Sequence, residues 1–146
     1  MSPATYFVAA SIIAAIGITF AFKQLARELE GKIEREETIS QGSFQQYLSR
    51  FFVKVGLIEA VPIVLVVLGY TQAEETSFDI LLPMVAVLLV LFFGLSNVFM
   101  IRRSMLSIPS LPNQTKNFIH TLSFIGMSLI GAIPIVSVVA ILTLNG

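Results

Sequence analysis

The stretch GLIEAVPIVLVVLG, residues 56–69, decides how this chain folds. Thirteen of its fourteen residues are glycine, alanine, proline or larger apolar residues, and the exception is Glu59. With the apolar residues that precede it, the stretch reaches the length of about 20 residues that a helix needs to cross the hydrocarbon core of a membrane. The sequence therefore predicts a membrane helix that carries a carboxylic acid near its middle.

The composition of the whole chain agrees with a membrane protein. Of the 146 residues, 55% are hydrophobic and 12% are charged, whereas soluble domains contain about 25% charged residues. The chain has no cysteine, and its single histidine, His120, cannot form a metal cluster by itself. It has no phosphate loop, nucleophile triad or metal-ligand spacing. We therefore expect no catalytic residue, metal, cofactor or nucleic-acid partner, and no stand-alone enzyme.

Four apolar stretches are long enough to span a membrane, at residues 4–22, 51–70, 79–101 and 118–144. The predicted fold class is therefore all-α, a membrane protein of four transmembrane helices in two tandem hairpins. The first stretch has neither the basic N-terminal region nor the short apolar core of a cleavable signal peptide. We expect it to be a retained helix.

The charged residues beside these stretches predict how the chain crosses the membrane. All nine Lys and Arg lie in or beside two connections, residues 23–50 and 102–117. The connection between them carries Glu74, Glu75 and Asp79 and no base. The positive-inside rule then places the two basic connections in the cytoplasm and both termini outside. The two hairpins are predicted to have the same, parallel orientation.

An internal repeat supports this arrangement. When the chain is shifted by 72 residues, GLIEAVPIVLVV (56–67) falls on SLIGAIPIVSVV (128–139), and eight of the twelve positions are identical. The repeat divides the chain into a first hairpin, residues 1–72, and a second hairpin, residues 73–146. The first helices of the two hairpins align weakly, and their main matches at this shift are Ala14 with Ala86 and Phe20 with Phe92.

The two copies differ at Glu59, because the matching residue of the second hairpin is Gly131. Glu59 lies about 12 Å along the helix from Phe51 and about 16 Å from Tyr70, at 1.5 Å per residue, so its carboxyl group is near mid-membrane. An ionised carboxylate there costs at least about 3 kcal/mol. A neutral acid that ionises only beside water or a cation is therefore expected, and a proton carrier requires such a group.

Pro62 adds a second feature to the same turn. A proline inside a helix removes the hydrogen bond to the carbonyl four residues earlier, which belongs to Ile58. The protonated Glu59 carboxyl group is one candidate donor to that free carbonyl. The alternative is a structural acid that holds a helix interface, for which Lys54 is a poor partner because it lies about 140° around the helix.

The pattern Glu-Ala-x-Pro-Ile at mid-membrane, in FFVKVGLIEAVPIVLVV (51–67), resembles the second helix of the rotor-ring proteolipids of rotary ATPases. These are subunit c of the F-type and subunit K of the V-type enzymes. The first hairpin is similar to theirs in IAAIGITFAFKQLARELEG (13–31), and the length of two hairpins resembles the duplicated V-type proteolipid. The first helix also carries a small face suited to close helix packing, made of Ala10, Ala14, Gly17 and Ala21.

The resemblance implies a proton-translocating rotor subunit. Glu59 would bind the ion, with Ile58 and Pro62 as backbone neighbours. The partners would be further proteolipid copies in a homo- or hetero-oligomeric ring, a stator subunit with an essential arginine, the central stalk and the lipid bilayer. Sodium-type members carry side-chain oxygens at positions that match Ala21 and Ala60 here. Neither residue has one, so the resemblance favours H⁺ over Na⁺.

A second interpretation remains open. The chain is then a non-transporting membrane scaffold or assembly subunit with a proteolipid-like fold. It is motivated by the missing acid at Gly131, by the longer first connection and by the bulky third helix, residues 79–101. Outside the repeat, Arg102 and Arg103 are interpreted as an anchor to anionic lipid headgroups, and Asn97 as a residue able to bond across helices.

Overall fold

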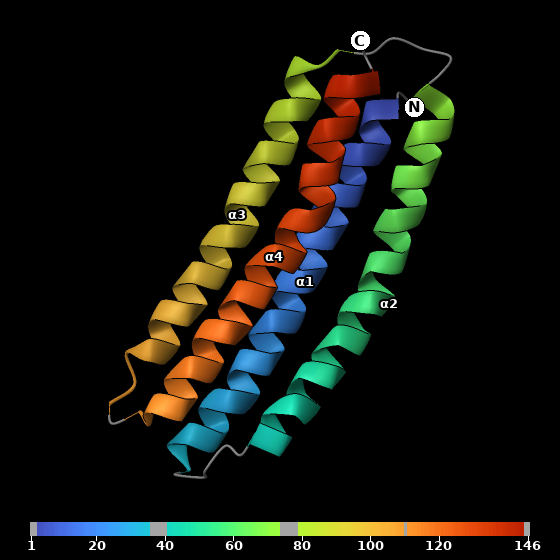
Figure 1. Ribbon diagram of the computed structural model, residues 1–146. Helices are drawn as coiled ribbons and strands as arrows, with labels where there is room; N and C mark the ends of the chain where they lie inside the picture. Colours follow the sequence, from blue (N-terminus) through green and yellow to red (C-terminus); the bar gives the residue numbers. More distant parts are fainter. Residues whose placement is uncertain (1–2, 36–40, 74–78, 110, 145–146) are drawn as a thin grey trace.

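The computed structural model describes residues 3–35, 41–73, 79–109 and 111–144. It contains four helices, α1 (Pro3–Glu34), α2 (Gln41–Ala73), α3 (Leu81–Leu106) and α4 (Asn113–Leu144) (Figure 1). Each is long and apolar enough to cross a membrane. The all-α class with four candidate spans is thereby confirmed, as an integral multi-pass membrane protein requires.

The four helices are not equivalent in their packing. α1 and α4 lie in the centre, where each contacts all three other helices, whereas the described residues of α2 and α3 do not touch each other. The turn between α1 and α2 and the turn between α3 and α4 lie at the same end of the bundle (Figure 1). Both hairpins therefore point the same way, and both termini lie at the opposite end. The acids Glu74 and Glu75, on which the predicted orientation depends, lie outside the described residues.

All four helices extend beyond the predicted spans at the end where the hairpins turn. α1 continues from the apolar stretch to Glu34, and α2 begins ten residues before Phe51. In the added turns of α1, Leu25 and Leu29 are buried while Lys23 and Arg27 are exposed. The extension is therefore an amphipathic helix whose apolar side packs on its neighbours.

α2 packs on the bundle along one narrow seam. Its covered residues recur at alternating spacings of four and three, which is the pattern of helices that cross at a small angle. They are Phe44, Leu48, Phe51, Val55, Ile58, Pro62, Leu65 and Gly69. Beside this seam, Ser43, Tyr47, Glu59 and Val66 are half-buried. The other described side chains of α2 are exposed, as Leu57 with 74% exposure illustrates. A membrane helix can leave such a face to lipid, because lipid tails are as apolar as leucine.

Polar contacts join the first hairpin to the second near the end that holds the termini. The Ser11 hydroxyl of α1 donates to the Phe7 carbonyl at 2.9 Å and is hydrogen-bonded to the Ser137 hydroxyl of α4 at 3.0 Å. All three residues are buried. The other end has an apolar link, since the rings of Phe44 in α2 and Phe118 in α4 stack with centroids 4.1 Å apart.

We expect Ser11 and Ser137 to be energetically coupled. A double-mutant cycle with Ser11→Ala and Ser137→Ala, measured by unfolding in detergent, should give a coupling energy of about 0.6 kcal/mol, the average for hydrogen bonds between membrane helices. The same cycle on Ser11 and Ser128, an exposed serine that donates within its own helix to Phe124, should give none. Equal coupling in the two cycles would show that the contact does not join the hairpins.

Candidate functional site

Glu59 lies at the edge of the α2 seam, one residue after Ile58. It is partly covered, and its Oε1 atom is shielded from the surroundings without a hydrogen-bond partner among the described residues. The positions one turn away on the same face are Val55, Gly56, Pro62 and Ile63, and none of them carries a charge or a hydroxyl group. The acid therefore has an apolar setting along its own helix.

No described base pairs with this acid. Lys54, the nearest base along α2, donates instead from its Nζ to Oε1 of Gln24 in α1 at 3.2 Å. The contact holds the ammonium group towards the end where the hairpin turns, as expected for a lysine that extends to the membrane surface. The alternative in which Glu59 is locked in an ion pair with Lys54 therefore finds no support in these contacts.

Ile58 and Pro62 position Glu59 on the helix. Pro62 is buried inside α2 and leaves the Ile58 carbonyl without its usual helical partner. The Ile58 side chain fills the space beside Gly17 of α1, where an added Cβ would overlap it. The backbone around the acid is thereby fixed against α1 at one point. The hydrogen bond from Glu59 to the Ile58 carbonyl stays a prediction.

The pairing of α1 with α2 corrects one sequence expectation. The resemblance matches Ala21 to the first-helix residue that faces the acid in sodium-type members, but the structure sets Gly17 at that level, against Ile58. Ala21 lies one turn closer to the hairpin turn, where it lines a small pocket with Phe51 and Lys54. Small residues recur along the whole face, with Ala10, Ala14 and Ala21 all buried, so composition alone does not set the offset between the helices.

The corrected pairing leaves the expectation about the ion unchanged. Neither Gly17 nor the exposed Ala60 has a side-chain oxygen. The nearest hydroxyl along α1 is that of Thr19, whose buried Oγ1 has no partner among the described residues. Thr19 follows Ala15 by one turn, and Ala15 lies against Gly94 of α3. Thr19 therefore lies on the side of α1 that meets α3, and not on the side that meets α2 at Gly17.

The second hairpin repeats the packing without the acid. Ile130, the repeat equivalent of Ile58, fills the space beside Gly94 of α3 in the way that Ile58 fills the space beside Gly17. Gly131 follows it and is buried, with Leu91 of α3 within van der Waals distance of a Cβ added there. The position that carries the carboxyl group in α2 is therefore a buried glycine in α4.

This comparison also corrects the alignment of the first helices. Ile58 and Ile130 lie 72 residues apart, but Gly17 and Gly94, which receive them, lie 77 apart. The matches of Ala14 with Ala86 and Phe20 with Phe92 therefore do not mark equivalent places in the two hairpins. Because α2 and α4 begin at equivalent residues, the difference of five residues lengthens α1 between its glycine and the hairpin turn.

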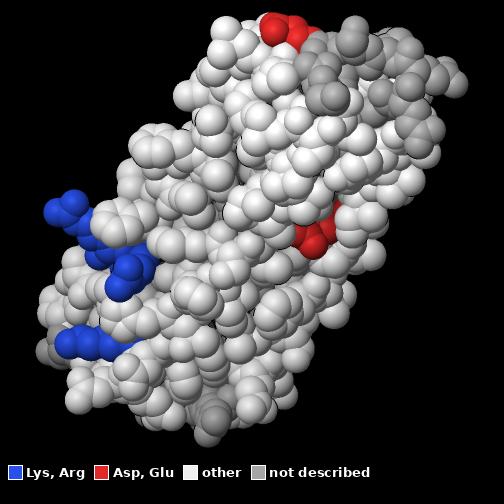
Figure 2. Space-filling view, turned by 45° about the horizontal axis from the view of Figure 1, so that its top comes forward, with Lys and Arg blue, Asp and Glu red and all other residues white. Residues whose placement is uncertain are grey.

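The charged residues on one face of the bundle are distributed unevenly. In Figure 2, Lys and Arg gather towards one end, most of the face is uncharged, and acidic atoms lie among uncharged side chains at mid-height. The described residues contain no group of three His, Asp or Glu side chains able to hold a metal ion. Figure 2 shows further acidic atoms at the opposite end from the Lys and Arg, so the distinctive feature of this surface is the carboxyl group that lies at mid-height among uncharged side chains.

Two further residues singled out in the sequence have local partners. The Asn97 side chain donates to the Phe93 carbonyl of its own helix at 2.8 Å, so the expected bond across helices is replaced by one within α3. His120 has its Nδ1 atom 2.9 Å from Nη2 of Arg102. The histidine therefore joins α4 to α3, a contact that was not predicted from the sequence.

No family model, curated protein or solved structure matches this chain.

Proposed function

We propose that this protein is a proton-carrying membrane subunit of the rotor-proteolipid type, in which Glu59 binds and releases H⁺ at mid-membrane. The observation that carries the proposal is the setting of that acid. Its Oε1 is shielded without a partner, its neighbours along α2 are apolar, and no described base pairs with it. In such a setting the neutral acid is the favoured resting form, and ionisation requires water or a cation brought by a partner.

The uncovered part of α2 supports the same proposal. Leu57, Val61 and Val64 are each more than half exposed, so the helix that carries the acid borders whatever surrounds the monomer. A stator helix with an arginine can approach such a face, which is how rotor proteolipids exchange their ion. Further copies of the chain, the central stalk and the lipid bilayer complete the proposed partners. The hairpin turns lie on the cytoplasmic side.

Gly131 gives the proposed subunit one acid for four helices. A ring of such subunits would carry fewer ions per turn than a ring with one acid per hairpin. ATP hydrolysis would then supply more driving force per ion, which suits a pump.

The buried glycine at position 131 favours a second candidate function. A hairpin that keeps the packing and lacks the acid is what a scaffold needs, and the chain is then a non-transporting assembly subunit. In this case the first hairpin retains Glu59 without using it for transport.

Purification from native membranes separates the two functions. The proton-carrying subunit should co-purify with the catalytic and stator subunits of a rotary ATPase, in a complex that contains several copies of this chain. The scaffold should co-purify with a different membrane complex. If the chain is recovered only with unrelated partners, the rotor proposal is contradicted, even if the complex contains several copies of the chain.

A further inference from the structure

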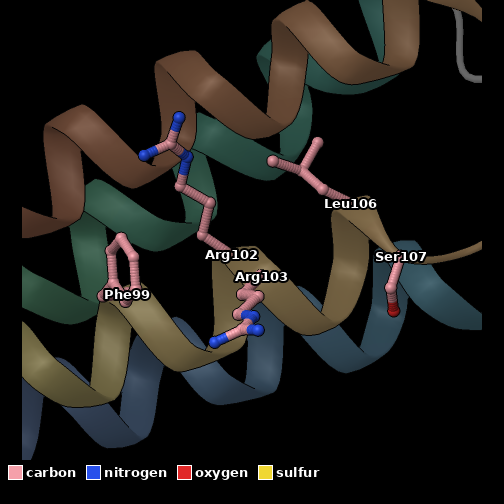
Figure 3. A pocket seen from close by; sticks show the side chains of 5 residues that line it. All are labelled: Phe99, Arg102, Arg103, Leu106 and Ser107. Atoms are coloured by element: carbon pink, nitrogen blue, oxygen red, sulfur yellow. The ribbon is translucent and has the colours of Figure 1, made fainter.

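A pocket lies at the end of α3 where the second hairpin turns. It has a volume of about 460 Å³ and is lined by Phe99, Arg102, Arg103, Leu106 and Ser107 (Figure 3). Phe99 and Leu106 are apolar, and the two arginines bring two positive charges. No acid is among the described residues that line the pocket. The combination of apolar walls and unopposed positive charge indicates an amphiphilic, anionic occupant.

The charge of the two guanidinium groups is not balanced within the described part of the chain. Arg102 donates from Nη2 to Nδ1 of His120, and this geometry requires an unprotonated Nδ1 and therefore brings no negative charge. The Nε atom of Arg102 is shielded and has no partner there. Arg103 is exposed and forms no ion pair with a described carboxylate. Both groups have donors left for an anion.

His120 gives the pocket a fixed element. Figure 3 shows the Arg102 side chain reaching towards α4, which carries His120, while Arg103 leaves α3 in a different direction. A guanidinium held by a neighbouring helix loses less freedom when it binds a ligand than one that moves freely. Guanidinium groups also match the oxygens of phosphate with two parallel hydrogen bonds.

The position of the pocket along the membrane identifies the source of the phosphate. Arg102 lies 21 residues after Leu81, the first residue of α3, which places it about 32 Å along the helix. The hydrocarbon core is about 30 Å thick. The arginines are therefore level with the headgroups, while Phe99, which is 52% exposed, lies one turn closer to the hydrocarbon.

We propose that this pocket binds an anionic phospholipid, with its phosphate against Arg102 and Arg103 and the start of an acyl chain against Phe99 and Leu106. A free phosphate ion would use only the polar half of the site. The inference is independent of the proposed proton transport, because it involves neither Glu59 nor the first hairpin.

Native mass spectrometry of the full-length protein tests the proposal. The protein is transferred from mixed micelles that hold equal amounts of phosphatidylglycerol and phosphatidylcholine with the same acyl chains, and the retained lipids are counted. The wild type should retain phosphatidylglycerol in preference. The double variant Arg102→Gln and Arg103→Gln should lower that preference by about thirtyfold, as expected when two hydrogen-bonded contacts of about 1 kcal/mol each are lost.

A matched pair controls for charge alone. Lys23 and Arg27 lie near the same end of the bundle and line a separate pocket that also contains Glu30. Replacing both with glutamine removes the same charge and should leave the lipid preference unchanged. An equal loss in the two double variants would show a general surface attraction and overturn the proposed site.

Two further measurements complete the test. Arg103→Gln alone keeps the contact between Arg102 and His120. It should lower the preference by about fivefold, the loss of one hydrogen-bonded contact, with helicity unchanged by circular dichroism. Inorganic phosphate at millimolar concentration should not displace phosphatidylglycerol. Displacement would show that the pocket binds free phosphate and overturn the assignment to lipid.

Discussion

Replacing Glu59 with glutamine is expected to abolish proton transport and leave the fold intact. Glutamine has nearly the same shape and is neutral, like the protonated acid, so the packing beside Ile58 and Gly17 is preserved. The amide cannot exchange H⁺ between water and mid-membrane. In the assembled complex reconstituted in vesicles, ATP-driven acidification should fall to background, while the amount of assembled complex should match the wild type.

Glu28→Gln is the matched control for this loss. Glu28 is an exposed acid on α1, near the end where the first hairpin turns, and its replacement removes one carboxylate outside the apolar region. Acidification should persist in this variant. Full acidification by the Glu59→Gln complex would mean that the proton is carried elsewhere and would favour the scaffold interpretation.

The second large effect is expected from filling the space beside Gly17. A Cβ at this position overlaps the Ile58 side chain, and the overlapping carbon belongs to a branched side chain that cannot turn aside easily. Gly17→Val should therefore lower the free energy of unfolding by about 1–3 kcal/mol, the usual cost of overpacking. Unfolding of the purified protein in mixed micelles by sodium dodecyl sulphate measures this change.

Two companion variants identify the cause. A Cβ at Gly56, on the uncovered face of α2, meets nothing within 4 Å, so Gly56→Val should cost much less. Adding Ile58→Ala to the Gly17→Val variant shortens the opposing side chain and should restore part of the free energy of unfolding that Gly17→Val loses. The free energy of unfolding that the double variant loses should be smaller than the sum of the losses of the two single variants. A larger loss would show that the close approach of α1 and α2 is not the source of the effect.

The four helices follow from the sequence because each carries its own signal. A run of apolar residues as long as the membrane is thick has few alternatives to a helix. The helices extend further because the turns beyond the runs keep an apolar side, as Leu25 and Leu29 show. Hydropathy alone does not reveal these turns, since their charged residues lower the average.

The packing of the helices follows from the sequence only in part. The small face of α1 predicts that another helix comes close, but Ala14, Gly17 and Ala21 are equally small candidates for the point of contact. Gly17 differs from these alanines in having no Cβ, and the Ile58 side chain occupies the space that a Cβ would fill. The contact between Arg102 and His120 joins residues on two helices, and no repeat or motif relates them in a single sequence.

The setting of Glu59 was partly predictable. Its depth follows from its place in the apolar run, and its lack of a partner along α2 follows from its neighbours. Its place at the edge of the seam, partly covered, required the structure, because it depends on which side of α2 meets α1. The sequence predicts the chemistry of the acid, and the packing determines how partners approach it.

Labelling with a hydrophobic carbodiimide tests most directly whether Glu59 is a protonated acid within the membrane. The reagent partitions into the hydrocarbon and adds to the acid form of a carboxyl group, so membranes at low pH should give a modified peptide that contains Glu59, with a rate that falls as the pH rises. Glu59→Gln should remove the modification, and the acids of α1 should remain unmodified. An unlabelled Glu59 across the whole pH range would contradict the account.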